Sequence, residues 1–263
     1  MPGLVLVALF AAVLSAAEHR LTDREIEQLL ERIDYDRGRL EQLLGEKLKR
    51  DSHTSQGELD VGHYLENLQQ NVGRVKSRFS PAYAASAEVT ILLQLASTID
   101  HQVASQFANF LASGEWQQFA AGLSDLAKAY GCSFPLATGA RARRVNDHEV
   151  QYAAGEIAKA AMRFEAALTA SLVADQAIDP SSQEALSAAL GTVKSAARWL
   201  ASNVAEGRHG TDAAKALLDA VLSVEALPAA RPQSRAADIP WTFVRSGLTR
   251  IAEAFDLVNP PEQ

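Results

Sequence analysis

The sequence predicts an all-α protein, and three observations support this fold class. Of the 263 residues, 48% are hydrophobic, and Ala and Leu, which lose little entropy in a helix, carry most of this share. Apolar residues recur over long stretches at spacings of three and four, as they do along one face of a helix. The 15 Gly and 9 Pro are few, and we expect every Pro to lie at or outside a helix end.

The chain begins with an apolar segment. Residues 4–17 are uncharged and apolar or small, end in Leu14-Ser15-Ala16-Ala17, and are followed by the polar Glu18-His19-Arg20. This pattern is typical of a secretory signal, except that no Lys or Arg precedes the apolar run. We expect a signal peptide over 1–17, cleavage near Ala17 and an extracytoplasmic mature chain, periplasmic or secreted. The alternative is a retained N-terminal anchor, although the run is shorter than the roughly 20 residues that span a bilayer.

Four amphipathic helices are expected in the first half of the mature chain. The first begins at the capping box Thr22-Asp23-Arg24-Glu25, in which the Thr and Glu side chains accept hydrogen bonds from each other's backbone amides. Pro81 closes the second helix, and Gly131 ends the fourth. The expected ranges are about 23–48, 60–79, 89–110 and 115–130.

The segment 133–144 is expected to be a linker. It contains a proline, a glycine and the basic cluster Arg141, Arg143 and Arg144, which we interpret as solvated. Lys and Arg total 25 against 32 for Asp and Glu, so the net charge is −7. An acidic chain has no general attraction to phosphate backbones, and nucleic acid is therefore not expected as a partner.

The second half resembles the first when the sequence is compared with itself. At an offset of 124, Thr22–Ile26 aligns with Asn146–Val150, so that both capping boxes coincide. At an offset of 125, Trp116 aligns with Trp241 and Gly122 with Gly247. Helical periodicity alone would not align a Trp, a Gly and the capping residues, so we predict an internal duplication.

The duplication gives the expected organisation of the whole chain. We predict two duplicated up-down four-helix units, about eight helices in all, because short connections favour antiparallel neighbours. The second set of helices is expected near 146–174, 180–204, 211–226 and 239–256, with an irregular loop over 227–239. The units are repeat unit 1 at 18–132, the linker at 133–144, repeat unit 2 at 145–258 and a tail at 259–263. Whether the units form separate bundles or one body stays open.

Two motifs also resemble a known group of proteins. The helix start at Leu21–Glu25 and the pattern Trp-x-x-Phe-x-x-x-Leu-x-x-Leu-Ala-x-x-Tyr at Trp116–Tyr130 are similar to those of uncharacterised secreted helical proteins of bacteria. The resemblance covers most of the mature chain and implies an envelope location. It implies no activity that could be assigned to a residue.

Few residues are candidates for catalysis or for binding a metal or cofactor. A di-iron bundle needs Glu-x-x-His motifs, and the sequence has none. The metal or acid–base candidate is Asp100-His101, for which the alternative is a solvated or capped polar pair. Met162 is a candidate axial ligand for haem. Cys132 is interpreted as a small hydrophobe rather than a reactive thiol. We assign no catalytic residue and expect no cofactor.

The three tryptophans are the candidate partner-binding residues. Trp116, Trp199 and Trp241 could serve as recognition anchors, since large aromatic side chains dominate binding surfaces. The alternative for Trp116 and Trp241, which hold matching positions, is a core anchor whose indole N–H donates to a carbonyl near a helix end. Trp199 aligns with Arg78 and is therefore particular to the second unit.

These observations lead to a functional hypothesis. We expect a non-catalytic, extracytoplasmic helical-bundle protein that binds or scaffolds an unidentified protein partner in the cell envelope. The alternatives are a haem- or metal-binding carrier and a membrane-associated accessory subunit with a retained N-terminal anchor. A hydrolase is the third possibility, because the lack of a motif is weak evidence against an enzyme.

Overall fold

The computed structural model describes residues 20–51, 61–106, 114–175, 180–230 and 235–257. Most of the described residues are helical, and they contain no strand beyond an isolated bridge between Ser80 and Tyr83, so the predicted all-α class is confirmed. The α-helices are α1 Asp23–Asp51, α2 Val61–Arg78, α3 Ser86–Gln106, α5 Gly114–Ala129, α6 Asp147–Asp175, α7 Pro180–Ala205, α8 Thr211–Glu225 and α9 Arg235–Ala254, and a short 3-10 helix spans Pro228–Ala230. The predicted signal segment 1–17 and tail 259–263 lie outside the described residues.

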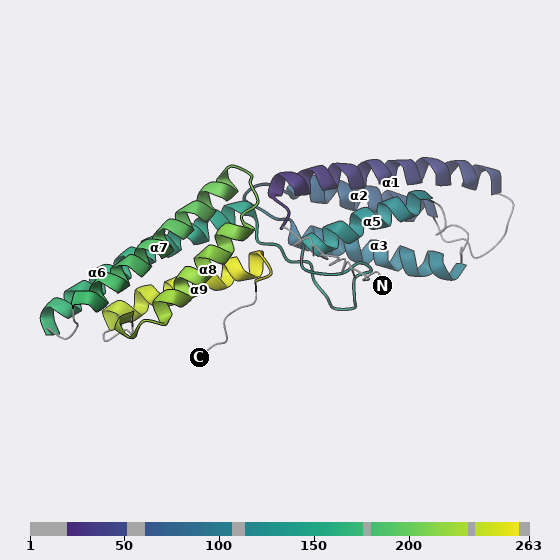
Figure 1. The fold of residues 1–263 in the computed structure, drawn as a ribbon. Coiled ribbons are helices and arrows are strands. Elements are labelled where there is room, and N and C mark those ends of the chain that lie inside the picture. The colour runs from purple at the N-terminus through teal and green to yellow at the C-terminus, as the bar shows by residue number, and fades with distance from the viewer. Residues whose placement is uncertain (1–19, 52–60, 107–113, 176–179, 231–234, 258–263) are drawn as a thin grey trace, which may run out of the picture.

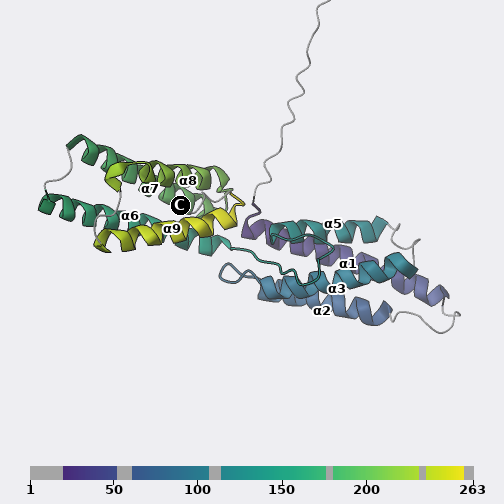
Figure 2. The ribbon, with the colours of Figure 1, turned by 90° about the horizontal axis from the view of Figure 1, so that it is seen from below.

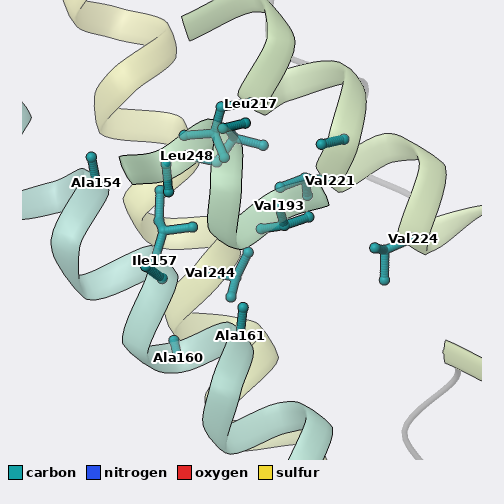
Figure 3. Packing of buried hydrophobic residues seen from close by; sticks show 14 of the residues in the cluster. Ala154, Ile157, Ala160, Ala161, Val193, Leu217, Val221, Val224, Val244 and Leu248 are labelled. Carbon is teal, nitrogen blue, oxygen red and sulfur yellow. The ribbon is translucent and has the colours of Figure 1, made fainter. Parts of the chain in front are cut away.

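The helices pack around two separate hydrophobic cores. Helices α1, α2, α3 and α5, here called the N-terminal bundle, enclose one cluster that includes Ile33, Leu92 and Phe119. Helices α6 to α9, the C-terminal bundle, enclose another, in which Ile157, Leu217 and Leu248 face one another (Figure 3). The two bundles lie end to end and give the molecule an elongated shape (Figure 1).

Both predicted capping boxes are present. The backbone amide of Thr22 donates to Glu25 Oε2 at 2.7 Å, and the amide of Glu25 donates to Thr22 Oγ1 at 3.3 Å. In the same way, the amide of Asn146 donates to Glu149 Oε2 at 3.0 Å, and the amide of Glu149 donates to Asn146 Oδ1 at 2.7 Å. These bonds satisfy amides that have no partner within the helix, and they fix where α1 and α6 begin.

The start of α9 corrects the sequence-based prediction. We expected a helix from residue 239 and every proline at or outside a helix end, but α9 begins at Arg235 and contains Pro240. Pro240 is the sixth residue of the helix, so it cannot donate to the carbonyl of Ala236, and its ring crowds that carbonyl.

The segment 133–144 packs against α3. Three of its backbone amides, those of Leu136, Ala142 and Arg144, donate to the hydroxyls of Ser97, Thr90 and Ser86. The prediction of a solvated basic cluster is wrong for Arg144, whose side chain is only 2% exposed, whereas Arg141 and Arg143 are exposed.

Within the described ranges, no helix combines the length and apolar character needed to cross a bilayer.

Candidate functional site

The N-termini of α1 and α6 meet where the two bundles join. The amide of Asp23 donates to Asp147 Oδ2 at 2.8 Å, and the amide of Asp147 donates to Asp23 Oδ2 at 2.9 Å. Each aspartate therefore caps the other helix. Negative charge is favourable at these positions because unpaired amides and the helix dipole make a helix N-terminus electropositive.

Two arginines complete this contact in a reciprocal way. Arg144 Nη2 donates to Asp23 Oδ1 at 2.8 Å and to the carbonyl of Leu21 at 2.6 Å. Arg20 donates from Nη1 to Asp147 Oδ1, and from Nη2 to the carbonyl of Val145 at 2.6 Å. We call Arg20, Asp23, Arg144 and Asp147 the junction cluster. It holds the start of one bundle against the start of the other.

The junction cluster is largely buried and electrically neutral. Burial lowers the pKa of Arg20, and the nearby positive charge of Arg144 lowers it further, while Asp147 and Asp23 act in the opposite direction. The Nε atom of Arg144 is buried and has no hydrogen-bond partner among the described residues. Desolvation offsets much of the attraction in a buried ion pair, but removing one partner leaves an uncompensated buried charge.

A groove with a cavity volume of about 1130 Å³ lies beside the junction cluster, and we call it the junction groove. Its lining includes Arg20, Arg144 and the ends of α5 and α9. The guanidinium of Arg20 lies 5.3 Å from the centre of the Phe255 ring, in the range of a cation–π contact. Arg143 reaches across to Glu253 at 3.2 Å and so links the connecting segment to α9. The lining carries charges of both signs, namely Arg20, Arg32, Lys128, Arg143 and Arg144 and the carboxylates Glu25, Asp125, Glu253 and Asp256.

The junction residues were not among the candidates from sequence. Arg20 and Arg144 are 124 residues apart, which is the offset that aligns the two capping boxes. This alignment is the signal that could have found them. The burial of an arginine, however, depends on a distant carboxylate that sequence periodicity does not identify.

Trp116 and Trp241 are core residues, only 3% and 4% exposed. Trp116 Nε1 donates to Asp100 Oδ1 at 3.0 Å, and Trp241 Nε1 donates to Glu225 Oε1 at 3.2 Å. The acceptors are thus carboxylates of the preceding helices, not the carbonyls that the sequence suggested. Their burial favours the core-anchor interpretation over a recognition surface.

The remaining candidates are not brought together. Trp199 is 46% exposed on α7, and Met162 is exposed on α6. Asp100 is engaged by Trp116, and the side chain of His101 lies outside the described residues. Burial raises the pKa of the Cys132 thiol, as expected for a small hydrophobe. In the part of the chain that the structure describes, no three His, Cys, Asp or Glu side chains cluster so as to hold a metal ion.

Comparison of the chain with known protein families, with curated proteins and with solved structures finds no match.

Proposed function

We propose that this chain is a non-catalytic, extracytoplasmic helical-bundle protein that binds or scaffolds a protein partner in the cell envelope. The observation that carries the proposal is the junction cluster. Four charged groups, all largely buried, join two bundles that each have a core of their own. A scaffold needs a fixed orientation, because a partner that contacts both bundles then loses less entropy on binding.

We further propose that the two bundles are duplicated four-helix units. Several contacts support this, since they recur 124 or 125 residues apart. A Cβ on Gly122 would lie 2.9 Å from Ile33 Cγ1, and a Cβ on Gly247 would lie 2.7 Å from Ile157 Cγ1. Helices α1 and α6 both have 29 residues. The reciprocal junction is the kind of self-complementary contact that two copies of one unit make across a two-fold axis.

The duplication has a direct test. An experimental structure in which α1, α2, α3 and α5 superpose in order on α6, α7, α8 and α9 would support it. A structure in which the two sets differ in helix order or handedness would contradict it.

The extracytoplasmic location rests on the apolar segment 4–17 and its small residues at the end. Mass spectrometry of the protein from its native host tests this part of the proposal. A mature chain that begins at or near Glu18 supports export with cleavage, and an intact N-terminus at Met1 or Pro2 contradicts cleavage.

Partner binding is tested in the native envelope. A tagged full-length chain, cross-linked in cells and separated on native gels, is expected to migrate in a complex larger than the monomer. The double variant Arg20→Met, Arg144→Met is expected to weaken that complex, whereas Arg32→Met, which breaks an exposed ion pair with Asp125, serves as the control. Recovery of the monomer alone from cross-linked envelopes would count against the proposal.

A further inference from the structure

One face of the C-terminal bundle combines exposed aromatic residues with basic ones. Helices α6 and α9 pack side by side (Figure 2). They run antiparallel, because Ile157 lies against Gly247 while Phe164, further along α6, contacts Trp241. The close approach at Gly247 brings the outer edges of the two helices together.

Each helix contributes one stripe of exposed residues to this face. On α6, Tyr152, Glu156, Lys159 and Arg163 follow the spacing i, i+4, i+7, i+11 and therefore share one side of the helix. On α9, Ile239, Phe243 and Arg250 follow the spacing i, i+4, i+11 and share the side of the helix that borders α6 next to Gly247. We call these two stripes the α6/α9 outer face. Along each helix the face is about 17 Å long, from the rise per residue.

The apolar members of the face are unusually exposed. Phe243 is 63% exposed, Tyr152 59% and Ile239 48%. They are not needed for the core, which the opposite sides of α6 and α9 supply. Aromatic side chains exposed next to basic ones are typical of helices that lie on a membrane surface.

The charges of the face are mainly positive. Lys159 donates to Glu156 at 2.8 Å, and this hydrogen bond raises the pKa of Lys159. Arg163 and Arg250 make no ion pair with another described residue. Within the two stripes, three cations stand against one carboxylate. One helical turn beyond them, Glu149 is exposed on α6, and Glu253 on α9 is paired with Arg143. The stripes themselves therefore carry an excess of positive charge on a chain whose net charge is −7. At physiological salt, charges beyond about 8 Å are largely screened, so the local sign governs close contact.

The α1/α5 pair offers an internal comparison. It packs in the same way, with Gly122 against Ile33, but its outer side carries paired charges. Arg32 binds Asp125 at 2.7 Å, and Arg39 lies 3.6 Å from Glu115. The positive charges of the α6/α9 outer face are therefore not a requirement of this helix packing.

We propose that the α6/α9 outer face docks the protein onto an anionic lipid bilayer, with Phe243 and Tyr152 entering the headgroup region and Arg163 and Arg250 contacting lipid phosphates. This goes beyond the proposed function, because it needs no protein partner. An anionic bilayer fits this face because its phosphates are opposite in charge to Arg163 and Arg250, and its headgroup region accommodates aromatic side chains. Each Arg or Lys held near an anionic surface is worth about a fivefold increase in binding.

The test is flotation of the full-length chain with vesicles of phosphatidylcholine alone or with 30 mol% phosphatidylglycerol. The measured quantity is the ratio of binding to the anionic vesicles over binding to the phosphatidylcholine vesicles. Any equal contribution of the apolar segment 4–17 to binding of both vesicle types then cancels. The double variant Arg163→Gln, Arg250→Gln is expected to lower this ratio about 25-fold, as two cations are lost. The matched control Arg32→Gln, Arg39→Gln is expected to change it less than about twofold, because those cations are already paired.

A second pair of variants tests the aromatic contribution. Phe243→Ser is expected to lower anionic-vesicle binding about tenfold, since a partly inserted phenyl ring is lost. Tyr35→Ser, at an equally exposed position of α1, should leave it unchanged. Circular dichroism confirms that each variant keeps its helical content.

Three results would overturn the proposal. The first is no preference of the wild-type chain for anionic vesicles. The second is an equal loss of binding in the double variant and its matched control. The third is binding to polyglutamate, but not to vesicles, that depends on Arg163 and Arg250, which would assign the face to an acidic protein. Because the flotation contains no partner protein, its failure leaves the proposed function untouched.

Discussion

Removing one arginine of the junction cluster should be far more costly than removing an exposed one. In Arg144→Met, the stem of the side chain is kept, but Asp23 loses its charged partner while its carboxylate stays 10% exposed. Breaking a buried ion pair on one side costs about 3–5 kcal/mol, since an uncompensated charge remains. The control Arg32→Met breaks a pair that is about half exposed, and it should cost about 0.2–1 kcal/mol.

The assay is urea unfolding followed by circular dichroism. The double variant Arg144→Met, Asp23→Asn keeps an acceptor for the amide of Asp147 and removes the buried charge, so it should be less destabilised than the sum of the single variants. A coupling energy of about 0.5–3 kcal/mol is expected for such a contact pair. The reasoning is refuted if Arg144→Met costs less than about 1 kcal/mol, which is the value expected for an exposed pair.

Two further predictions concern packing and pH. Gly247→Ala should destabilise the protein by about 1–3 kcal/mol, because the added Cβ would lie 2.7 Å from Ile157 Cγ1. Gly191→Ala should stabilise it by about 0.5–1 kcal/mol, because the space around Gly191 is open. Thermal melts of both variants check that the two changes in stability have opposite signs. The hydrogen bond from Lys194 lowers the pKa of Glu165 below its ordinary value of 4.5, so the stability that it adds is present at neutral pH and is lost as the pH falls below 4.5. The stability difference between wild type and Glu165→Gln should therefore shrink between pH 7 and pH 3, and a difference that stays constant would contradict the assignment.

Local features of the fold were predictable from the sequence. The two capping boxes depend on residues three positions apart, and the Gly131 cap depends on one residue that adopts φ +64°. Helix starts at 23, 147 and 211 agree with the expected positions within a residue. Such signals are read correctly because the atoms that form them are neighbours in the chain.

Features that depend on distant partners could not be predicted in this way. Arg144 stands in a polar segment with a proline and a glycine nearby, which is the usual setting of a solvated residue. Its burial results from Asp23, which lies 121 residues away. The carboxylate acceptors of Trp116 and Trp241 were missed for the same reason, because both lie on a preceding helix.

The α6/α9 outer face could not be predicted from the sequence either. Sequence periodicity places Tyr152 and Phe243 on the polar sides of their helices, but it does not say that those sides border each other. Only the contact of Gly247 with Ile157 brings the two stripes onto one surface. Trp199, the exposed candidate from sequence, lies on α7 and is not part of this face.

The central claim is that the junction cluster holds the two bundles in one orientation. The most direct measurement is the distance distribution between spin labels at Tyr35→Cys on α1 and Ala166→Cys on α6, in a chain with Cys132→Ala. We expect a narrow distribution that broadens in the double variant Arg20→Met, Arg144→Met while helical content is unchanged. A broad distribution in the parent chain, or one that the double variant leaves unaltered, would contradict the claim.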